Sequence, residues 1–370
     1  MTLESFTTLT SYLIVFLLSV VFAGLYQNSR KRGEVRGGFA EFVFRAAVIL
    51  PVALLIGLRG LDVGWDTSSM VYSYISDNYT LSYLISSSHD PFSLIACKLL
   101  YALSAGNVTV ALFVFSFATL YILELAIIKW DDGMPLPLAL LVYYLYFACT
   151  GMDQMKQMLA LSILAYAVAC LVDGQRGRFF LLTIVAGLFH FSAFFGFAFY
   201  LFYLKDDKHP ILVFLLIAFC MAGTVFSDYF FSLLGRFFGE GAYADYFTGR
   251  FAQQAQDATG RTGFRFVLDV VPCLFPVFFR KRLPESTRAL ILVSLVAVMP
   301  LRMLGYQSEF LGRLAYEPAL MIVFAYPLVC KSFSVRKRFA FSLASTVLLI
   351  CYFYAAYSTS HGVVPYSFAF

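Results

Sequence analysis

Charged residues are scarce in this sequence. Asp, Glu, Lys and Arg make up 13% of its 370 residues, whereas 61% are hydrophobic; soluble domains carry about twice that share of charge. Apolar runs of roughly 15 to 25 residues recur along the chain, and about 20 such residues cross a bilayer as a helix. The composition excludes a soluble globular fold. It predicts an all-α polytopic membrane protein of about 10 to 12 membrane segments, forming one membrane domain over residues 1–370.

Motifs for soluble cofactors and metals are also missing. There is no Gly-x-Gly-x-x-Gly, P-loop, His-Glu-x-x-His or Gly-x-Ser-x-Gly pattern. The seven cysteines lie in or beside apolar runs without metal-ligand or disulfide spacing, which is typical of buried thiols. We therefore expect no metal and no cofactor. The net charge of +5 comes from short loops and does not indicate a nucleic-acid partner.

Lys and Arg cluster in short loops between the apolar runs, and the positive-inside rule places such loops in the cytoplasm. The clusters are 30–36, 173–178, 205–209, 280–288 and 331–338. The predicted membrane helices are 9–26, 42–58, 107–128, 136–150, 155–172, 210–227, 264–279, 289–305, 314–330 and 338–357, with a shorter element at 92–103 on the outer surface. The first eight residues contain no Lys or Arg, so the first run is expected to be a retained helix rather than a signal peptide.

One apolar stretch conflicts with this alternation. Residues 179–204 lie between two basic loops assigned to the cytoplasm, but about 26 residues are too few for two full crossings. We expect a re-entrant or broken helix with its apex near His190. The alternative is one long helix, which would move one of the basic loops to the other side.

The other polar clusters then fall on the non-cytoplasmic face. They lie at 59–91, 150–157, 190–192, 228–263, 302–313 and in the C-terminal tail. Ionisable residues at the membrane are costly and usually functional. Their convergence predicts an outward-facing site, with 59–91 and 228–263 as outward loops.

Three cations are predicted in the first turn of helices that begin at this face: Lys156, Arg265 and Arg313. A helix N-terminus already carries partial positive charge, so a cation there requires a compensating anion. Asp153 is expected to cap the helix of Lys156. We interpret the three cations as an anion site. Side chains that snorkel to lipid phosphate are the alternative.

Further candidates suit acid–base chemistry and sugar binding. The imidazole of His190 suits a general base near neutral pH, although a lone membrane histidine is often a packing residue. The loop 228–263 interleaves aromatic residues with Arg, which favours either sugar and phosphate contacts or an interfacial helix. The remaining candidate ligands for a sugar or phosphate are Gln157, Tyr246, Arg250 and Glu309.

Seven segments, taken in order, resemble the EpsG family of Wzy-like proteins of bacterial exopolysaccharide and O-antigen assembly. They are "RGLDVGWDT", "HDPFSLIACKLL", "MKQMLALSIL", "GLFHFSAFF", "YADYF", "GRLAYEPALMI" and "VPYSF". The family pattern has Arg-Gln where this chain has Lys156-Gln157, and Lys keeps the charge without the planar fork. It has Glu-Pro where this chain has Asp90-Pro91.

The resemblance implies an integral-membrane glycosyltransferase with a GT-C-like helical core, facing the periplasm in the bacterial inner membrane. Its substrates would be undecaprenyl-pyrophosphate-linked oligosaccharides, which it would join into a polymer. A chain-length regulator and a flippase of the same pathway are the implied protein partners.

The resemblance also implies roles for the cluster that follows the second apolar run. Arg59 would position the pyrophosphate, and Asp66 would contact the acceptor sugar or act as the base. The alternative is that Arg59 and Asp62 pair with each other and cap helix 42–58.

Two other functions use the same kind of substrate. A lipid-linked glycan flippase or other transporter would need polar residues through the depth of the bilayer, and often internal repeats; the ionisable residues here crowd one face instead. A ligase or non-polymerising transferase with the same donor is the third possibility, which the sequence does not exclude.

Overall fold

The computed structural model describes residues 1–35, 37–72, 90–131, 133–203, 262–305 and 309–369. Within these ranges all regular elements are helices, and eight are long and apolar enough to cross a membrane. The prediction of an all-α polytopic membrane protein is confirmed. The chain divides into two compact units, which are described separately: unit 1 comprises 1–191 and 326–370, and unit 2 comprises 192–325.

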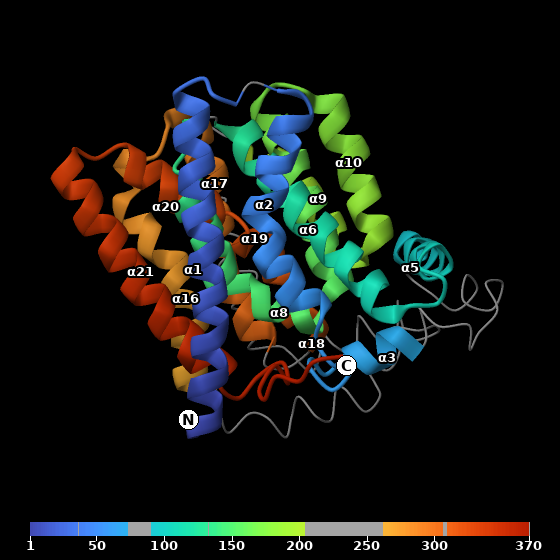
Figure 1. The fold of residues 1–370 in the computed structure, drawn as a ribbon. Coiled ribbons are helices and arrows are strands. Elements are labelled where there is room, and N and C mark those ends of the chain that lie inside the picture. The colour runs from blue at the N-terminus through green and yellow to red at the C-terminus, as the bar shows by residue number, and fades with distance from the viewer. Residues whose placement is uncertain (36, 73–89, 132, 204–261, 306–308, 370) are drawn as a thin grey trace, which may run out of the picture. The chain divides into compact units, whose positions relative to one another are not determined.

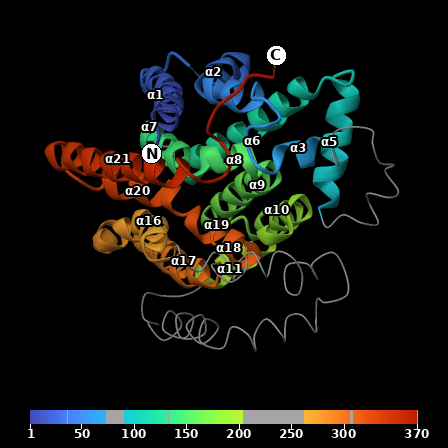
Figure 2. The same ribbon diagram turned by 90° about the horizontal axis from the view of Figure 1, so that it is seen from below.

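Unit 1 is built on a row of long helices (Figures 1 and 2). Helix α1 packs on α2, α2 on α6, α6 on α9 and α9 on α10. The helices of the row are α1 (Leu3–Lys31), α2 (Gly38–Gly57), α6 (Val108–Trp130), α9 (Met155–Val172) and α10 (Arg176–Phe189). The other elements are α3 (Thr67–Met70), α5 (Pro91–Leu103), α7 (Leu136–Tyr143), the π-helix η2 (Tyr144–Ala148), α8 (Cys149–Asp153) and α21 (Val335–Tyr357).

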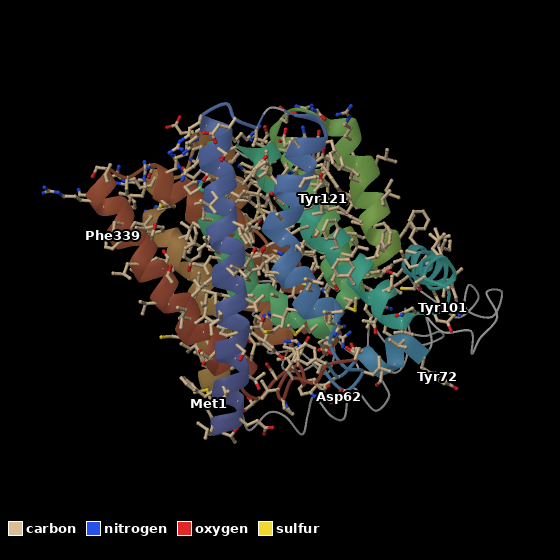
Figure 3. All side chains as sticks on the ribbon, viewed as in Figure 1. Met1, Asp62, Tyr72, Tyr101, Tyr121 and Phe339 are labelled. Atoms are coloured by element: carbon tan, nitrogen blue, oxygen red, sulfur yellow. The ribbon has the colours of Figure 1, made fainter. Side chains whose placement is uncertain are left out.

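The core of unit 1 is the continuous helical stretch α7–η2–α8. It is apolar on all sides, and 94% of the stretch Leu136–Asp153 is buried, as expected for a helix surrounded by protein rather than lipid. Polar side chains in this stretch form hydrogen bonds within the protein. For example, the hydroxyl of Tyr144 lies 2.7 Å from that of Ser19. Helix α21 is different: only 33% of its apolar window is buried, and Phe339 projects from it with 71% exposure, as suits a lipid-facing helix (Figure 3).

The basic loops of unit 1 share one end of the helix row. Lys129 pairs with Asp173 at 2.8 Å, and Lys331 pairs with Asp131 at 2.8 Å. Gln27 donates to the carbonyl oxygen of Met134 at 2.6 Å. These contacts bring together the loops that follow α1, α6, α9 and α20 (Ile322–Lys331), as the positive-inside rule requires of loops on one side. We call this end the basic end.

The opposite end of unit 1 gathers the polar motifs. Loop 58–67 follows α2 there and meets the segment 358–369 through backbone hydrogen bonds, including the isolated bridge between Arg59 and Phe368. The segment 150–157 and the C-terminal end of α10 lie at the same end (Figure 1). We call this the polar end. Within unit 1, the predicted convergence of these segments is therefore found.

Unit 2 is organised around α17 (Glu285–Gly305). This helix packs on α16 (Thr262–Leu274), α11 (Phe197–Tyr203), α18 (Glu309–Leu314) and α19 (Tyr316–Ala319). The 3-10 helices are η3 (Phe191–Gly196), whose first residue belongs to unit 1, and η5 (Phe275–Arg282). The basic cluster 280–288 lies at the start of α17, whereas Arg302 and α18 lie at its other end.

The predicted break near His190 is present. Helix α10 ends at Phe189, His190 is extended (φ −155°, ψ 123°), and η3 begins at Phe191. The short helix predicted at 92–103 is α5. The predicted helix 210–227 lies outside the described residues, as do residues 73–89 and 228–261 of the two expected outward loops.

Candidate functional site

Residues 150–157 contact several other parts of the chain at the polar end of unit 1. We call these residues the hub segment. It comprises the end of α8, Gln154 and the first turn of α9. The side-chain hydroxyl of Thr150 lies 3.0 Å from that of Tyr357 in α21. Other residues of the hub segment contact loop 58–67, the segment 358–369, and the junction between α5 and α10. Four parts of the chain therefore meet at eight consecutive residues.

Arg59 lies beneath loop 58–67 and is fully buried. Its guanidinium donates to the carbonyl oxygens of Ile56 and Val63, the latter at 3.3 Å, and approaches Met155 Sδ at 2.8 Å. It also donates to Thr67 Oγ1 at 3.3 Å. Burial lowers the pKa of Arg59 to about 10, which still leaves it charged at neutral pH. In this arrangement Arg59 holds the loop together, and a pyrophosphate contact would require it to leave these partners.

Half of the alternative interpretation of Arg59 is confirmed. The side chain does cap the C-terminal end of α2, through the carbonyl of Ile56. Its partner is not Asp62, because the carboxylate of Asp62 accepts from the hydroxyl of Ser367 instead. The pairing of Arg59 with Asp62 is therefore wrong, since the segment 358–369 supplies the donor for Asp62.

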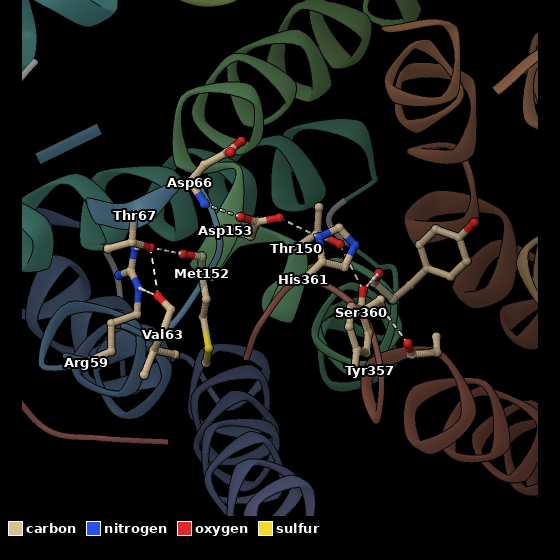
Figure 4. A network of polar contacts seen from close by, with 12 residues as sticks. Arg59, Val63, Asp66, Thr67, Thr150, Met152, Asp153, Tyr357, Ser360 and His361 are labelled. Carbon is tan, nitrogen blue, oxygen red and sulfur yellow. Dashed lines mark hydrogen bonds and ion pairs between the residues drawn. The ribbon is translucent and has the colours of Figure 1, made fainter. Parts of the chain in front are cut away.

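Asp66 is positioned through its backbone. Its N–H donates to Asp153 Oδ1 at 2.8 Å, and its carboxylate points away from Asp153 (Figure 4). The side chain is partly exposed, immediately before α3. The main chain of Asp66 is thus anchored to the hub segment, and its role as a carboxylate that meets a ligand stays a prediction.

The prediction that Asp153 caps α9 is wrong. The residue preceding α9 is Gln154, and no side-chain cap is formed there. Asp153 ends α8 instead, is 3% exposed in its side chain, and places Oδ2 2.7 Å from Nδ1 of His361. Both oxygens of its carboxylate are thus engaged by groups from distant parts of the chain, Asp66 and His361.

Lys156 has the compensating anion that its place in the first turn of α9 requires. Its Nζ lies 2.8 Å from Oδ2 of Asp90, the residue before α5. The side chain of Lys156 is 22% exposed and that of Asp90 is 11% exposed. Burial acts to raise the pKa of Asp90, but Lys156 and His190 outweigh it and hold that pKa below its usual value. Unlike Arg59, Lys156 has access to solvent at the polar end.

His190 lies beside this ion pair. Oδ1 of Asp90 accepts from the backbone N–H of Phe191 at 3.1 Å, and the hydroxyl of Ser93 donates to the carbonyl of Phe189 at 2.6 Å. The start of α5 thus caps the end of α10 and stabilises the extended backbone of His190. Lys156 and His190 therefore both act on the carboxylate of Asp90, and their membership of one functional site stays a prediction.

The other candidates are distributed more widely. Gln157 is buried in the first turn of α9. Arg265 is the fourth residue of α16, near its start as predicted, and Glu309 is the first residue of α18. Arg313 lies in the last turn of α18 and not in the first turn of a helix, because the chain forms a separate short helix before α19; that placement was predicted wrongly. Tyr246 and Arg250 lie outside the described residues.

Unit 2 contains a buried polar pair that the sequence analysis did not select. The hydroxyl of Ser192 donates to Oε1 of Glu317 at 2.5 Å, and Glu317 is fully buried. Nearby in sequence, Arg302 stacks over the ring of Tyr316 at 4.4 Å. Glu317 lies within "GRLAYEPALMI", and Ser192 within "GLFHFSAFF". A carboxylate in an otherwise apolar membrane stretch was the available signal for Glu317.

His361 and Asp90 were also not selected as site residues. His361 stands before Gly362, and Asp90 stands between His89 and Pro91. Their partners Asp153 and Lys156 are 208 and 66 residues away in the chain, so the local sequence does not indicate them. Within the described ranges no cluster of three or more His, Cys, Asp and Glu residues could hold a metal ion.

The polar end offers a specific chemistry. A partly exposed carboxylate (Asp66), an imidazole (His190) and an accessible cation (Lys156) can accept a proton and stabilise a developing anion. Lys156 lies at the start of the candidate membrane span α9, and Asp66 and His190 lie in connections between helices at the same end of unit 1. The fold and these groups define an integral membrane protein with polar residues gathered at the end opposite its basic loops.

A family model described as the EpsG family matches residues 42–368. The chain belongs to the EpsG family, and it is a membrane protein of polysaccharide biosynthesis. No curated protein and no solved structure matches it.

Proposed function

We propose that the protein is a Wzy-type glycosyltransferase that polymerises undecaprenyl-pyrophosphate-linked oligosaccharide repeat units on the periplasmic face of the bacterial inner membrane. The observation that supports it best is the junction of Lys156, Asp90 and His190 at the polar end, opposite the basic loops. It joins a cation for a pyrophosphate to a base for a hydroxyl, in a member of the EpsG family.

In the proposed reaction, a sugar hydroxyl of one lipid-linked unit attacks the anomeric carbon of another. The new glycosidic C–O bond forms while the bond from the anomeric carbon to the pyrophosphate oxygen breaks, and the lipid pyrophosphate leaves with the electron pair. The hydroxyl proton passes to His190 or Asp66. Lys156 stabilises the leaving anion, and each such charge-assisted contact contributes roughly 1.5–3 kcal/mol.

The ion pair with Asp90 defines how Lys156 would work. In the absence of substrate its charge is balanced by Asp90 at 2.8 Å, so a pyrophosphate would compete with this carboxylate for the ammonium group. Arg265, Arg313 and Arg250 are the further proposed counter-charges, and Gln157, Tyr246 and Glu309 the proposed sugar contacts. Arg59 is proposed to act on the anion only indirectly, by supporting the loop that carries Asp66.

The proposal is tested by incubating the purified protein with one lipid-linked repeat unit, without nucleotide sugar. A ladder of products that differ by whole repeats is the expected result; Lys156→Ala should remove most of it, and Lys156→Arg should keep a substantial part. A single product of fixed size would instead indicate a ligase or a non-polymerising transferase. Transfer of the intact substrate across a proteoliposome membrane, without new bonds, would indicate a flippase.

The protein partners follow from the same proposal. A flippase would deliver the lipid-linked units to the periplasmic leaflet, and a chain-length regulator would set how many are joined. Copurification of either with this protein from crosslinked membranes would support the assignment.

A further inference from the structure

Asp153 and His361 form a buried acid–base pair at the polar end. Oδ2 and Nδ1 are 2.7 Å apart, and the two side chains are 3% and 10% exposed. A carboxylate in its ionised form only accepts hydrogen bonds, so an ionised Asp153 requires the tautomer of His361 that carries the hydrogen on Nδ1. A buried carboxylate is costly unless its oxygens are bonded. Here the second oxygen is bonded to the backbone N–H of Asp66.

His361 is also held in an uncommon backbone conformation. Its φ is 65°, in the left-handed region that only a few per cent of residues other than Gly adopt, with Asn, Asp and His the most frequent among them. Surrounding contacts maintain it: its carbonyl accepts from the N–H of Trp65 at 3.2 Å, and its ring lies against the rings of Trp65 and Tyr357, at 6.2 and 5.7 Å between centroids. Strain of this kind persists where the neighbouring structure fixes the residue firmly, and it clusters at functional sites.

The contacts of His361 belong to a larger seam between the segment 358–369 and loop 58–67. Gly64 N donates to Gly362 O at 2.8 Å, and Gly60 N donates to Ser367 O at 2.8 Å. Asp153 connects this seam to the hub segment, because its carboxylate bonds to Asp66 of loop 58–67 and to His361 of the segment 358–369 (Figure 4).

We infer that Asp153 and His361 are positioning residues for the proposed transfer: together they fix the backbone of Asp66 and thereby the direction in which its carboxylate meets the acceptor sugar. The inference rests on the proposed function. Misplacement of a reacting group by about 1 Å can cost on the order of 10²-fold in rate, so a pair that never touches the substrate can control the reaction.

Three substitutions of one residue separate this role from packing and from catalysis. His361→Asn places an amide N–H where Nδ1–H lies, and Asn tolerates the left-handed backbone. His361→Gln shifts the amide away from Asp153 and is strained at this φ. His361→Gly accommodates the backbone but removes the side chain.

We expect His361→Asn to keep kcat within about fivefold of the unchanged protein, and His361→Gln and His361→Gly to lose about 10–100-fold. KM for the lipid-linked substrate should change little, because the pair acts through Asp66 during the reaction. Hydrogen exchange of a peptide covering 59–67 in the purified protein provides the readout that is independent of activity. Exchange should accelerate in the Gln and Gly variants and stay slow in the Asn variant.

Unchanged exchange and unchanged kcat in His361→Gln would overturn the inference. A second result would also overturn the inference: loss of activity in His361→Asn while exchange of 59–67 stays slow. It would show that the imidazole of His361 takes part in the reaction directly. If the unchanged protein makes no polymer, the proposed function fails together with the reaction that the pair would serve, while the exchange data still show whether the pair holds the loop.

Discussion

Single side chains at the polar end differ in what they can do, even where the sequence presents them alike. Arg59 and Lys156 are both cations in family motifs, yet Arg59 is fully buried among carbonyls whereas Lys156 is 22% exposed and paired with the carboxylate of Asp90. Only the second can approach a substrate without rearrangement of a loop. The pair of Lys156 with Asp90 is accordingly where substitutions are most informative.

Lys156→Ala should abolish most of the polymerisation while the protein still inserts and folds, because it removes the accessible counter-charge. Lys156→Arg should keep substantial activity because it keeps the charge. Arg313→Ala is the companion variant in unit 2, where the same loss is expected. Normal ladders from both alanine variants would contradict the anion site.

Asp90→Asn should destabilise the protein by about 1–3 kcal/mol at neutral pH, since Lys156 and the N–H of Phe191 lose a charged acceptor. The pKa of Asp90 is lowered in the folded protein. Its stabilising contribution is therefore present above the unfolded value near 3.9 and is lost as the pH falls through the lower folded value. Thermal unfolding in detergent at several pH values measures this: the gap between the two proteins should close below about pH 4. A constant gap down to pH 3 would show that the charge of Asp90 is not the cause.

His190→Ala should reduce the rate by about 10²–10⁴-fold if its imidazole is the base, with little change in substrate binding. His190→Gln restores hydrogen bonding but not basicity, so it should be equally inactive at normal protein levels. An active Gln variant beside an unstable Ala variant would make His190 structural and leave Asp66 as the base.

At the scale of elements, the helices and the break at His190 could be predicted, because apolar run length and the placement of basic residues depend on local sequence. The end of α8 could not. Asp153 resembled a helix cap, but its carboxylate is taken by Asp66 and His361, which are 87 and 208 residues away. The residues around Asp153 in the sequence do not indicate those partners. For the same reason, the burial of Arg59 followed from packing and not from its motif.

The contact between loop 58–67 and the hub segment depends on a glycine. Gly64 has φ +91°, and a Cβ added there would lie 2.5 Å from the carbonyl oxygen of Met152. We expect Gly64→Ala to destabilise the loop by at least about 1–2 kcal/mol, through left-handed strain and this clash. Melting temperature and hydrogen exchange of 59–67 are the measurements.

Gly174 is the matched control for that substitution. It also has positive φ, +78°, but a Cβ there meets nothing within 4 Å. Gly174→Ala therefore carries the strain without the clash. Equal effects of the two substitutions would show that the close approach to Met152 is unimportant.

At the scale of the whole molecule, the basic clusters along the sequence predict the topology of both units, and within unit 1 the structure separates a basic end from a polar end. Single cysteines in a cysteine-less background should react with an impermeant reagent at positions in 59–91 and 228–263, but not in 280–288. Labelling of 280–288 in intact cells would overturn the orientation. The sequence could predict this division because the positive-inside rule acts on each loop separately.

The seam between loop 58–67 and the segment 358–369 also has a consequence for biogenesis. The hydroxyl of Ser367 and the carboxylate of Asp62 that accepts from it are 305 residues apart in the chain. The ribosome therefore delivers Arg59, Asp66 and Asp153 to the membrane long before their last partners exist. Until residues 358–369 emerge, Asp153 lacks His361, and the loop lacks half of its backbone acceptors. The polar end would thus mature last, after insertion of the helices, so an incompletely synthesised chain could be embedded in the bilayer while its site is still unformed.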